Sequence, residues 1–240
     1  MNIAQKSSCI NLKIYFIIIM TLNLDNVTIV CIDGVDPNVG VKALKYSMQK
    51  INFAQNIILS HIKPDIIPGG VNYVEIPELT HHTYSYFCLH ELYKYFTTDF
   101  VLIIHDDGFV INPQLWTKEF LNYDYIGAPW RGEGDNRVGN GGFSLRSRKL
   151  VNLCRTIQWG GGHEDGEICI TQRQHFLNNG CKFAPPELAA RFSLESKLHD
   201  VEYNLENSFG FHGKGVVESV HYGEGQQFKD KLKLRDAVVL

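Results

Sequence analysis

The chain has 240 residues, of which 44% are hydrophobic and 20% charged, and its formal net charge is −3. These values are ordinary for one large soluble domain or two small ones. The net charge is small and negative, and charges of one sign form no long block. Both features argue against nucleic acid as the main partner.

The six cysteines indicate a reducing compartment. They are spread along the chain, and Cys31, Cys88 and Cys169 fall within apolar patterns, where a free cysteine behaves as a small hydrophobic residue. No two of them have the Cys-x-x-Cys spacing that suggests a zinc site. Because their positions suit free, buried thiols, we expect unpaired cysteines and a cytoplasmic location.

The N-terminal segment has an apolar run, residues 14–20, after Lys6 and Lys13. This order resembles a signal peptide, but the run is short and no small-residue cleavage site follows it. It is also too short to cross a bilayer as a helix. We therefore expect residues 1–25 to form an extension or a first strand without stable membrane insertion, and residues 26–240 to form a single domain.

Strand-like and helix-like segments alternate in the first part of the chain. Apolar runs and apolar–polar alternation predict strands over residues 26–34, 56–63 and 71–76. Apolar residues at helical spacing predict helices over residues 38–51 and 83–96. This alternation predicts an α/β fold of three layers, with a mixed, mainly parallel central sheet between helices.

The segment that organises the chain is the strand predicted over residues 100–104, an apolar run suited to burial on both faces. The run ends on His105, Asp106, Asp107 and Gly108. Ligands of open α/β sheets gather at the carboxyl ends of strands, and two adjacent carboxylates favour a divalent cation such as magnesium or manganese. An ordinary Asp-Gly turn is the alternative.

Asp33 occupies the same kind of position, in an Asp-Gly pair at the end of the first predicted strand. It could contact a nucleotide there, and a plain turn is again the alternative.

Farther along the chain, Arg146 and Arg148 could reach a diphosphate or be solvated surface charges.

Glycine-rich segments follow the central strand. A short helix predicted over residues 116–121 precedes the glycine cluster of residues 139–142, which leads into a strand and a helix start. Glycines let a backbone approach a ligand closely, and a flexible turn is the alternative.

Residues 159–165 combine an indole and three glycines with Glu164 and Asp165. The dipole of a helix start would favour these acids for structural reasons alone.

These motifs together resemble a glycosyltransferase of the GT-A type. Residues 105–107 are similar to the Asp-x-Asp metal motif of that superfamily, with histidine in place of the first acid. Residues 141–144 and 159–165 resemble the Gly-Gly and Trp-Gly-Gly-Glu-Asp segments of inverting galactosyltransferases. Residues 209–213, Phe-Gly-Phe-His-Gly, lie where such enzymes carry a late metal-binding histidine. The whole pattern, over residues 27–213, is similar to a poorly characterised GT-A-like family of bacteria and large viruses.

The resemblance implies sugar transfer from a nucleotide-diphosphate donor to a hydroxyl of a carbohydrate or other acceptor. Asp107 and His212 would hold Mn²⁺ or Mg²⁺, which neutralises the charge that develops on the leaving diphosphate. Asp106 would hold the metal's waters or the donor ribose, and Gly141 and Gly142 would line the donor site.

The resemblance also implies an acid–base site for the acceptor, because the attacking hydroxyl must lose its proton to a carboxylate. Asp165 is expected to be this base, and Glu164 is the alternate or a hydrogen-bond partner of the acceptor. Trp130 and Trp159 offer flat faces against which sugar rings can pack. One base and one in-line displacement predict an inverted product.

Two other classes of function fit the same residues. Asp106, Asp107 and a histidine would also serve a metal-dependent hydrolase of phosphate esters. The replacement of the first acid, at position 105, would suit a sugar- or nucleotide-binding module without catalysis.

Overall fold

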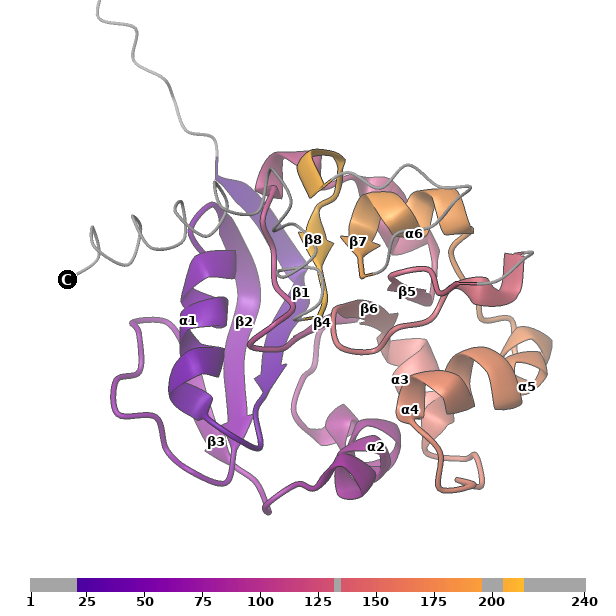
Figure 1. The fold of residues 1–240 in the computed structure, drawn as a ribbon, viewed down its shortest axis with the longest axis horizontal. Helices are drawn as coiled ribbons and strands as arrows, with labels where there is room; N and C mark the ends of the chain where they lie inside the picture. Colours follow the sequence, from indigo (N-terminus) through magenta and orange to yellow (C-terminus); the bar gives the residue numbers. More distant parts are fainter. Residues whose placement is uncertain (1–20, 132–134, 196–204, 214–240) are drawn as a thin grey trace, which may run out of the picture.

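The computed structural model describes residues 21–131, 135–195 and 205–213 (Figure 1). The apolar run at residues 14–20, and the part of the expected domain beyond residue 213, lie outside these described residues. Within them, no helix combines the length and the apolar character needed to cross a membrane.

Six strands form one central sheet in the order β3-β2-β1-β4-β6-β5. Neighbouring strands from β3 to β4 run parallel, whereas β6 is antiparallel to both β4 and β5. The expected mixed, mainly parallel sheet is therefore confirmed. The strands are β1 (Leu22–Ile32), β2 (Ile51–Ser60), β3 (Asn72–Glu75), β4 (Phe100–Ile104), β5 (Tyr125–Gly127) and β6 (Ser144–Ser147).

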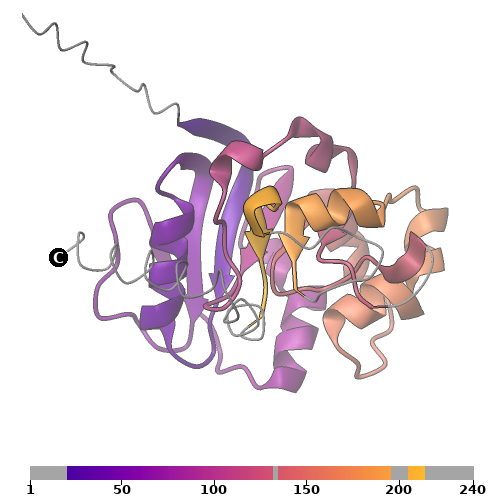
Figure 2. The same ribbon diagram turned by 45° about the horizontal axis from the view of Figure 1, so that its top comes forward.

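Helices cover both faces of this sheet (Figure 1 and Figure 2). They are α1 (Pro37–Ser47), α2 (His81–His90), α3 (Arg148–Cys154), α4 (Glu164–Gly166), α5 (Arg173–Asn178) and α6 (Pro186–Phe192). Helix α4 continues as one π-helical segment, Glu167–Thr171. Short 3-10 helices lie at Leu92–Lys94, Pro113–Leu115, Lys118–Asn122, Asp135–Arg137 and Leu205–Asn207. A second, two-stranded parallel sheet pairs β7 (Ser193–Leu194) with β8 (Gly210–Phe211).

Strand β4 shows how the core is divided between the two faces of the sheet. Leu102 packs in the cluster that contains Leu44 of α1, whereas Ile103 packs in the cluster that contains Phe87 of α2. Each such buried side chain contributes about 1.5–3 kcal/mol relative to exposure. Burial on both faces is the reason that the strand has an unbroken apolar sequence. All five cysteines in the described part of the chain are free and buried.

Helix α1 is shorter than the predicted range of residues 38–51. It ends at Ser47, and Ile51 already belongs to β2, where it pairs with Leu22. An apolar residue at that position fits the buried face of a helix or of a strand equally well, so the helical spacing continued past the true end of the helix.

The segment of residues 205–213 returns to the middle of the molecule (Figure 1). Gly210 forms a bridge with Val110, just beyond β4. A side chain has no room there, since a Cβ on Gly210 would lie 2.3 Å from the Phe143 ring. This close approach brings His212 to the carboxyl end of β4.

Gly127 of β5 provides a test of how tightly the glycine cluster is packed on the sheet. A Cβ on Gly127 would lie 2.1 Å from the Gly139 carbonyl oxygen. Because that atom belongs to the backbone, we expect Gly127→Ala to lower the free energy of unfolding by about 1–3 kcal/mol in urea denaturation. Gly69→Ala is the matched control: its Cβ meets no atom within 4 Å, and the expected change is within about 0.5 kcal/mol. Equal stabilities of the two variants would contradict this account.

Candidate functional site

A tight turn closes the end of β4. The His105 amide donates to the Gly108 carbonyl at 2.9 Å, and the Gly108 amide donates back to the His105 carbonyl at 3.2 Å. The turn presents Asp106, which is exposed, and Asp107, which is half-buried, at the carboxyl edge of the sheet. An Asp-Gly turn and a polar cluster are therefore both present here.

His212 reaches the same edge from a segment much later in the chain. Its amide donates to the Leu194 carbonyl at 2.8 Å, and the Gly213 amide donates to the Asp107 carbonyl at 2.9 Å. The His212 ring lies against bare backbone, since a Cβ on Gly142 would be 2.0 Å from its Nε2. Backbone bonds and this contact together fix the imidazole beside Asp107.

His105, Asp107 and His212 form one group, in which each offers a ligand atom within 4.8 Å of the others. Nε2 of His212 lies 3.6 Å from Oδ1 of Asp107, and the two imidazole centroids are 5.6 Å apart. Two imidazole nitrogens and a carboxylate oxygen are suitable donors for a divalent transition-metal ion. The residues present therefore fit a metal ion, and they include both ligands predicted from the sequence.

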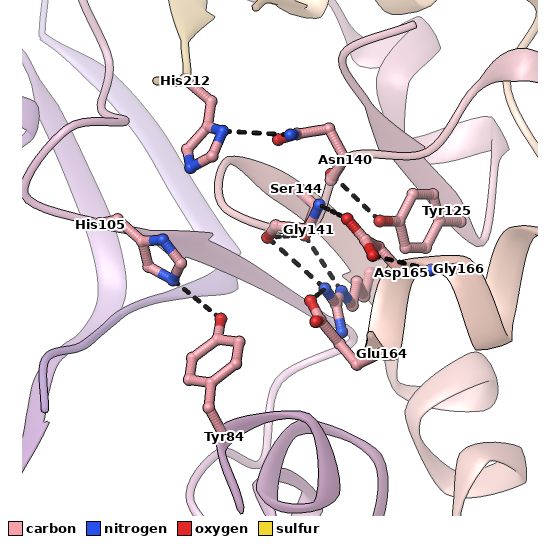
Figure 3. A network of polar contacts seen from close by, with 11 residues as sticks. Tyr84, His105, Tyr125, Asn140, Gly141, Ser144, Glu164, Asp165, Gly166 and His212 are labelled. Carbon is pink, nitrogen blue, oxygen red and sulfur yellow. Dashed lines mark hydrogen bonds and ion pairs between the residues drawn. The ribbon is translucent and has the colours of Figure 1, made fainter. Parts of the chain in front are cut away.

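Each imidazole of the group has a hydrogen-bond partner at one of its two ring nitrogens (Figure 3). The Tyr84 hydroxyl lies 2.8 Å from Nε2 of His105. Nδ1 of His212 lies 3.2 Å from Oε1 of Glu195 and 3.1 Å from Nδ2 of Asn140. Such partners fix the orientation of an imidazole ring and select which nitrogen carries its proton.

The two histidines have pKa values shifted in opposite directions. Burial, followed by the charge of His212, lowers the pKa of His105 to about 4, although Asp107 opposes this. Burial also acts to lower the pKa of His212, but the hydrogen bond with Glu195 and the surrounding carboxylates raise it overall. His105 is therefore uncharged at neutral pH, as a ligand nitrogen must be.

A second polar group lies at the start of α4. Nη2 of Arg146 is 2.9 Å from Oε1 of Glu164, and the two side chains are only 1% and 6% exposed. Burial raises the pKa of Glu164, with Arg146 acting against it. A solvated surface role for Arg146 is therefore wrong, because its charge is compensated by a carboxylate inside the protein. The Glu164 carboxylate is engaged in this pair, and Gly141 lies directly against it.

Asp165 stands next to this pair and is half-buried. Its Oδ2 accepts a hydrogen bond from the Gly141 amide at 3.0 Å, and its Oδ1 accepts one from the Gly166 amide at 2.7 Å (Figure 3). Its charge is among those that raise the pKa of His212. Asp165 is thus oriented by backbone donors and interacts electrostatically with His212.

Asp33 fixes a turn at the end of β1. Its Oδ1 accepts hydrogen bonds from the amides of Val35 and Asp36, both at 2.9 Å. Burial is the largest cause of the raised pKa of the Cys31 thiol, and the charges of Asp33 and Asp106 raise it further. Both carboxylates therefore lie near this thiol, at one end of the sheet. Donor-binding roles for Asp33 and Asp106 stay predictions.

The two tryptophans expected to contact an acceptor are both half-buried. Trp130 packs on Gly139, where a Cβ would lie 2.1 Å from its ring. Trp159 packs beside His82 with ring centroids 4.4 Å apart, and its Nε1 donates to the Gly162 carbonyl at 2.9 Å. Contact with an acceptor stays a prediction for both residues.

The sequence alone did not identify three contributors to this site. His105 precedes the two aspartates directly, so its position at a strand end was an available signal. Tyr84 and Glu195 stand in other elements, and no local pattern around either residue indicates its contact with an imidazole.

Residues 72–212 match the sequence profile of a family described as proteins of unknown function, DUF5672. No curated protein matches the chain. Similar solved structures include the mannosyltransferase PcManGT from Pyrobaculum calidifontis in complex with GDP-Man and Mn²⁺, with 13% identity, a TM-score of 0.42, and coverage of 67% of this chain and 54% of that one. The galactosyltransferase LgtC in complex with donor and acceptor sugar analogues has 15% identity and a TM-score of 0.42, and the match covers 77% of this chain and 86% of LgtC. A glycosyltransferase involved in glycosylation of the major capsid of PBCV-1 has 12% identity and a TM-score of 0.44, and the match covers 79% of this chain and 93% of that one.

The low pKa of His105 predicts a loss of stability in mild acid for the metal-free protein. The unfolded chain takes up this proton near pH 6.5 and the folded chain near pH 4, so the free energy of unfolding falls as the pH is lowered between these values. From about pH 7 to pH 5 we expect a loss on the order of 2 kcal/mol from this group. Urea denaturation in the presence of a chelator measures it, and His105→Gln should remove it. An identical loss in the wild type and in this variant would refute the assignment.

Proposed function

The chain belongs to the DUF5672 family, and from this premise we propose that it is a metal-dependent glycosyltransferase of the GT-A type. In this proposal it moves a sugar from a nucleotide-diphosphate donor to an acceptor hydroxyl with inversion of configuration. The observation that carries it is the meeting of His105, Asp107 and His212 at the carboxyl end of β4. Open α/β sheets bind ligands at that edge.

The donor would bind with its diphosphate beside the group of His105, Asp107 and His212. A divalent ion bound there, Mn²⁺ or Mg²⁺, supplies neutralisation of the charge that develops on the leaving diphosphate. Asp106 is exposed beside Asp107, from where it can hydrogen-bond metal-bound water or the donor ribose. Asp33 lies at the same end of the sheet and would contact the nucleotide.

The glycine cluster would form the floor of the donor site. Gly141 and Gly142 have no side chains, which leaves room for the Glu164 carboxylate and the His212 ring. These contacts place the glycine backbone next to His212, beside which the donor would bind.

Asp165 would act as the base that takes the proton of the acceptor hydroxyl. Its oxygens are oriented by the Gly141 and Gly166 amides, and each carboxylate oxygen retains a lone pair for a further donor. Glu164 is the weaker candidate, because it is buried in its ion pair with Arg146. Trp130 and Trp159 would provide the apolar faces for the acceptor.

A metal-dependent phosphoester hydrolase is the second candidate function. The observation that favours it is the donor set itself, since two histidines and an aspartate can also hold an ion that activates water. In that reaction Asp165 would have no sugar acceptor to deprotonate.

A panel of nucleotide sugars with manganese distinguishes the candidates. Release of nucleoside diphosphate is the expected result, whereas release of inorganic phosphate would favour the hydrolase. Tight binding without turnover would favour a non-catalytic binding module.

The control for this panel is Asp107→Asn, which nearly keeps the shape of the side chain but removes its charge. We expect it to abolish the metal dependence of nucleoside diphosphate binding in calorimetry. Equal affinity with and without manganese in the unmodified protein would count against a metal enzyme.

Asp165→Asn tests the base. Turnover should fall by a factor of roughly 10²–10⁴, the usual contribution of a positioned general base, while donor affinity changes little because Asp165 would face the acceptor. Glu164→Gln should instead lower stability, since it weakens the compensation of a buried charge. NMR of the product's anomeric proton reads the configuration directly. Normal turnover in Asp165→Asn, or a retained configuration, would remove Asp165 from this role.

A further inference from the structure

We propose that the group at the end of β4 is a two-histidine, one-carboxylate centre that selects a nitrogen-preferring transition-metal ion over Mg²⁺. Its ligand atoms are Nδ1 of His105, Nε2 of His212 and a carboxylate oxygen of Asp107. This inference rests on the proposed metal-dependent function and specifies which class of ion the site takes.

The contacts of the two imidazoles assign the ligand nitrogens. The Tyr84 hydroxyl is 2.8 Å from Nε2 of His105, which leaves Nδ1 for a metal. Figure 3 shows this nitrogen on the side of the ring nearer His212. In His212 the Glu195 carboxylate lies 3.2 Å from Nδ1. Nε2 of His212 remains, 3.6 Å from Oδ1 of Asp107.

Two other carboxylates near the group have hydrogen-bond partners of their own. Glu195 lies beside Nδ1 of His212. Both oxygens of Asp165 accept backbone hydrogen bonds, from the amides of Gly141 and Gly166. Asp107 is the carboxylate in the group, with an oxygen within 4.8 Å of a ligand nitrogen of each histidine.

This donor set decides the class of ion. Mg²⁺ prefers oxygen ligands in a near-ideal octahedron and gives up water reluctantly. Imidazole nitrogen suits zinc, iron and nickel, and affinity for nitrogen-containing sites rises from manganese through iron and cobalt to nickel. Mg²⁺ would use the single carboxylate and keep water in its other positions, whereas a transition-metal ion would also gain two imidazole nitrogens. The second nitrogen, from His105, therefore favours the transition-metal ion over Mg²⁺.

Direct titration of the metal-free protein with Co²⁺ and with Mg²⁺ tests the proposal. Calorimetry should give a Kd for Co²⁺ at least tenfold lower than the Kd for Mg²⁺. In His105→Asp an oxygen replaces a nitrogen, so the ratio of the two affinities should fall at least tenfold. His81→Asp is the matched control, because His81 is exposed on α2 and lies outside the group; there the ratio should not change. Circular dichroism shows whether each variant is folded.

Tyr84→Phe tests the assignment of Nε2. Loss of the hydroxyl should weaken Co²⁺ binding by about 10–100-fold, the usual effect of removing the partner of a ligand histidine. The same substitution in a His105→Asp background should have little effect, since its target is gone. The visible absorption of bound Co²⁺ should shift in His105→Asp and not in His81→Asp.

The outcomes separate this inference from the proposed function. Equal affinity for Mg²⁺ and Co²⁺, an unchanged ratio in His105→Asp, or no binding of either ion overturns the selectivity. Nucleoside diphosphate release supported equally by Mg²⁺ would overturn the selectivity and leave the glycosyltransferase standing. Selective Co²⁺ binding without release from any nucleotide sugar would support the centre and remove the glycosyltransferase.

Discussion

The arrangement of the candidate site depends on one buried ion pair, between Arg146 of β6 and Glu164 at the start of α4. Removing one partner of such a pair costs on the order of 3–5 kcal/mol, because the other charge is left uncompensated. Nη2 of Arg146 also lies 3.5 Å from the Gly141 carbonyl oxygen, so β6, the glycine cluster and α4 form one unit. Asp165 follows Glu164 directly and bonds the amide of the same Gly141. The ion pair therefore determines where that carboxylate stands.

The glycine cluster joins the two halves of the site by backbone alone. Gly141 lies against Glu164 and Gly142 lies against the His212 ring, and a Cβ on either glycine would overlap its neighbour. The Gly141 amide also bonds Asp165, so His212 and Asp165 border the same two-glycine backbone.

The sequence predicted the strand over residues 100–104 and its polar end, because burial on both faces leaves an unbroken apolar run. It could not predict by spacing that Asp107 and His212 meet, and only the family resemblance connected the two segments. Arg146 shows why the remainder was out of reach. A lone arginine in a short strand has the pattern of a surface charge, and its burial depends on Glu164, which belongs to another element. Tertiary partners of this kind leave no local signal.

The late position of β8 has a consequence for how the protein is made. Synthesis delivers the N-terminal segments first, so the strands β1, β2, β3 and β4 can pair while β8 is still inside the ribosome. His105 and Asp107 can therefore stand at the edge of an ordered sheet before His212 exists. The group is completed only when β8 docks on Leu194 and Val110. An unfinished chain can have these strands paired and still lack one of the three residues of the group, so the complete group marks a chain whose translation has passed residue 212.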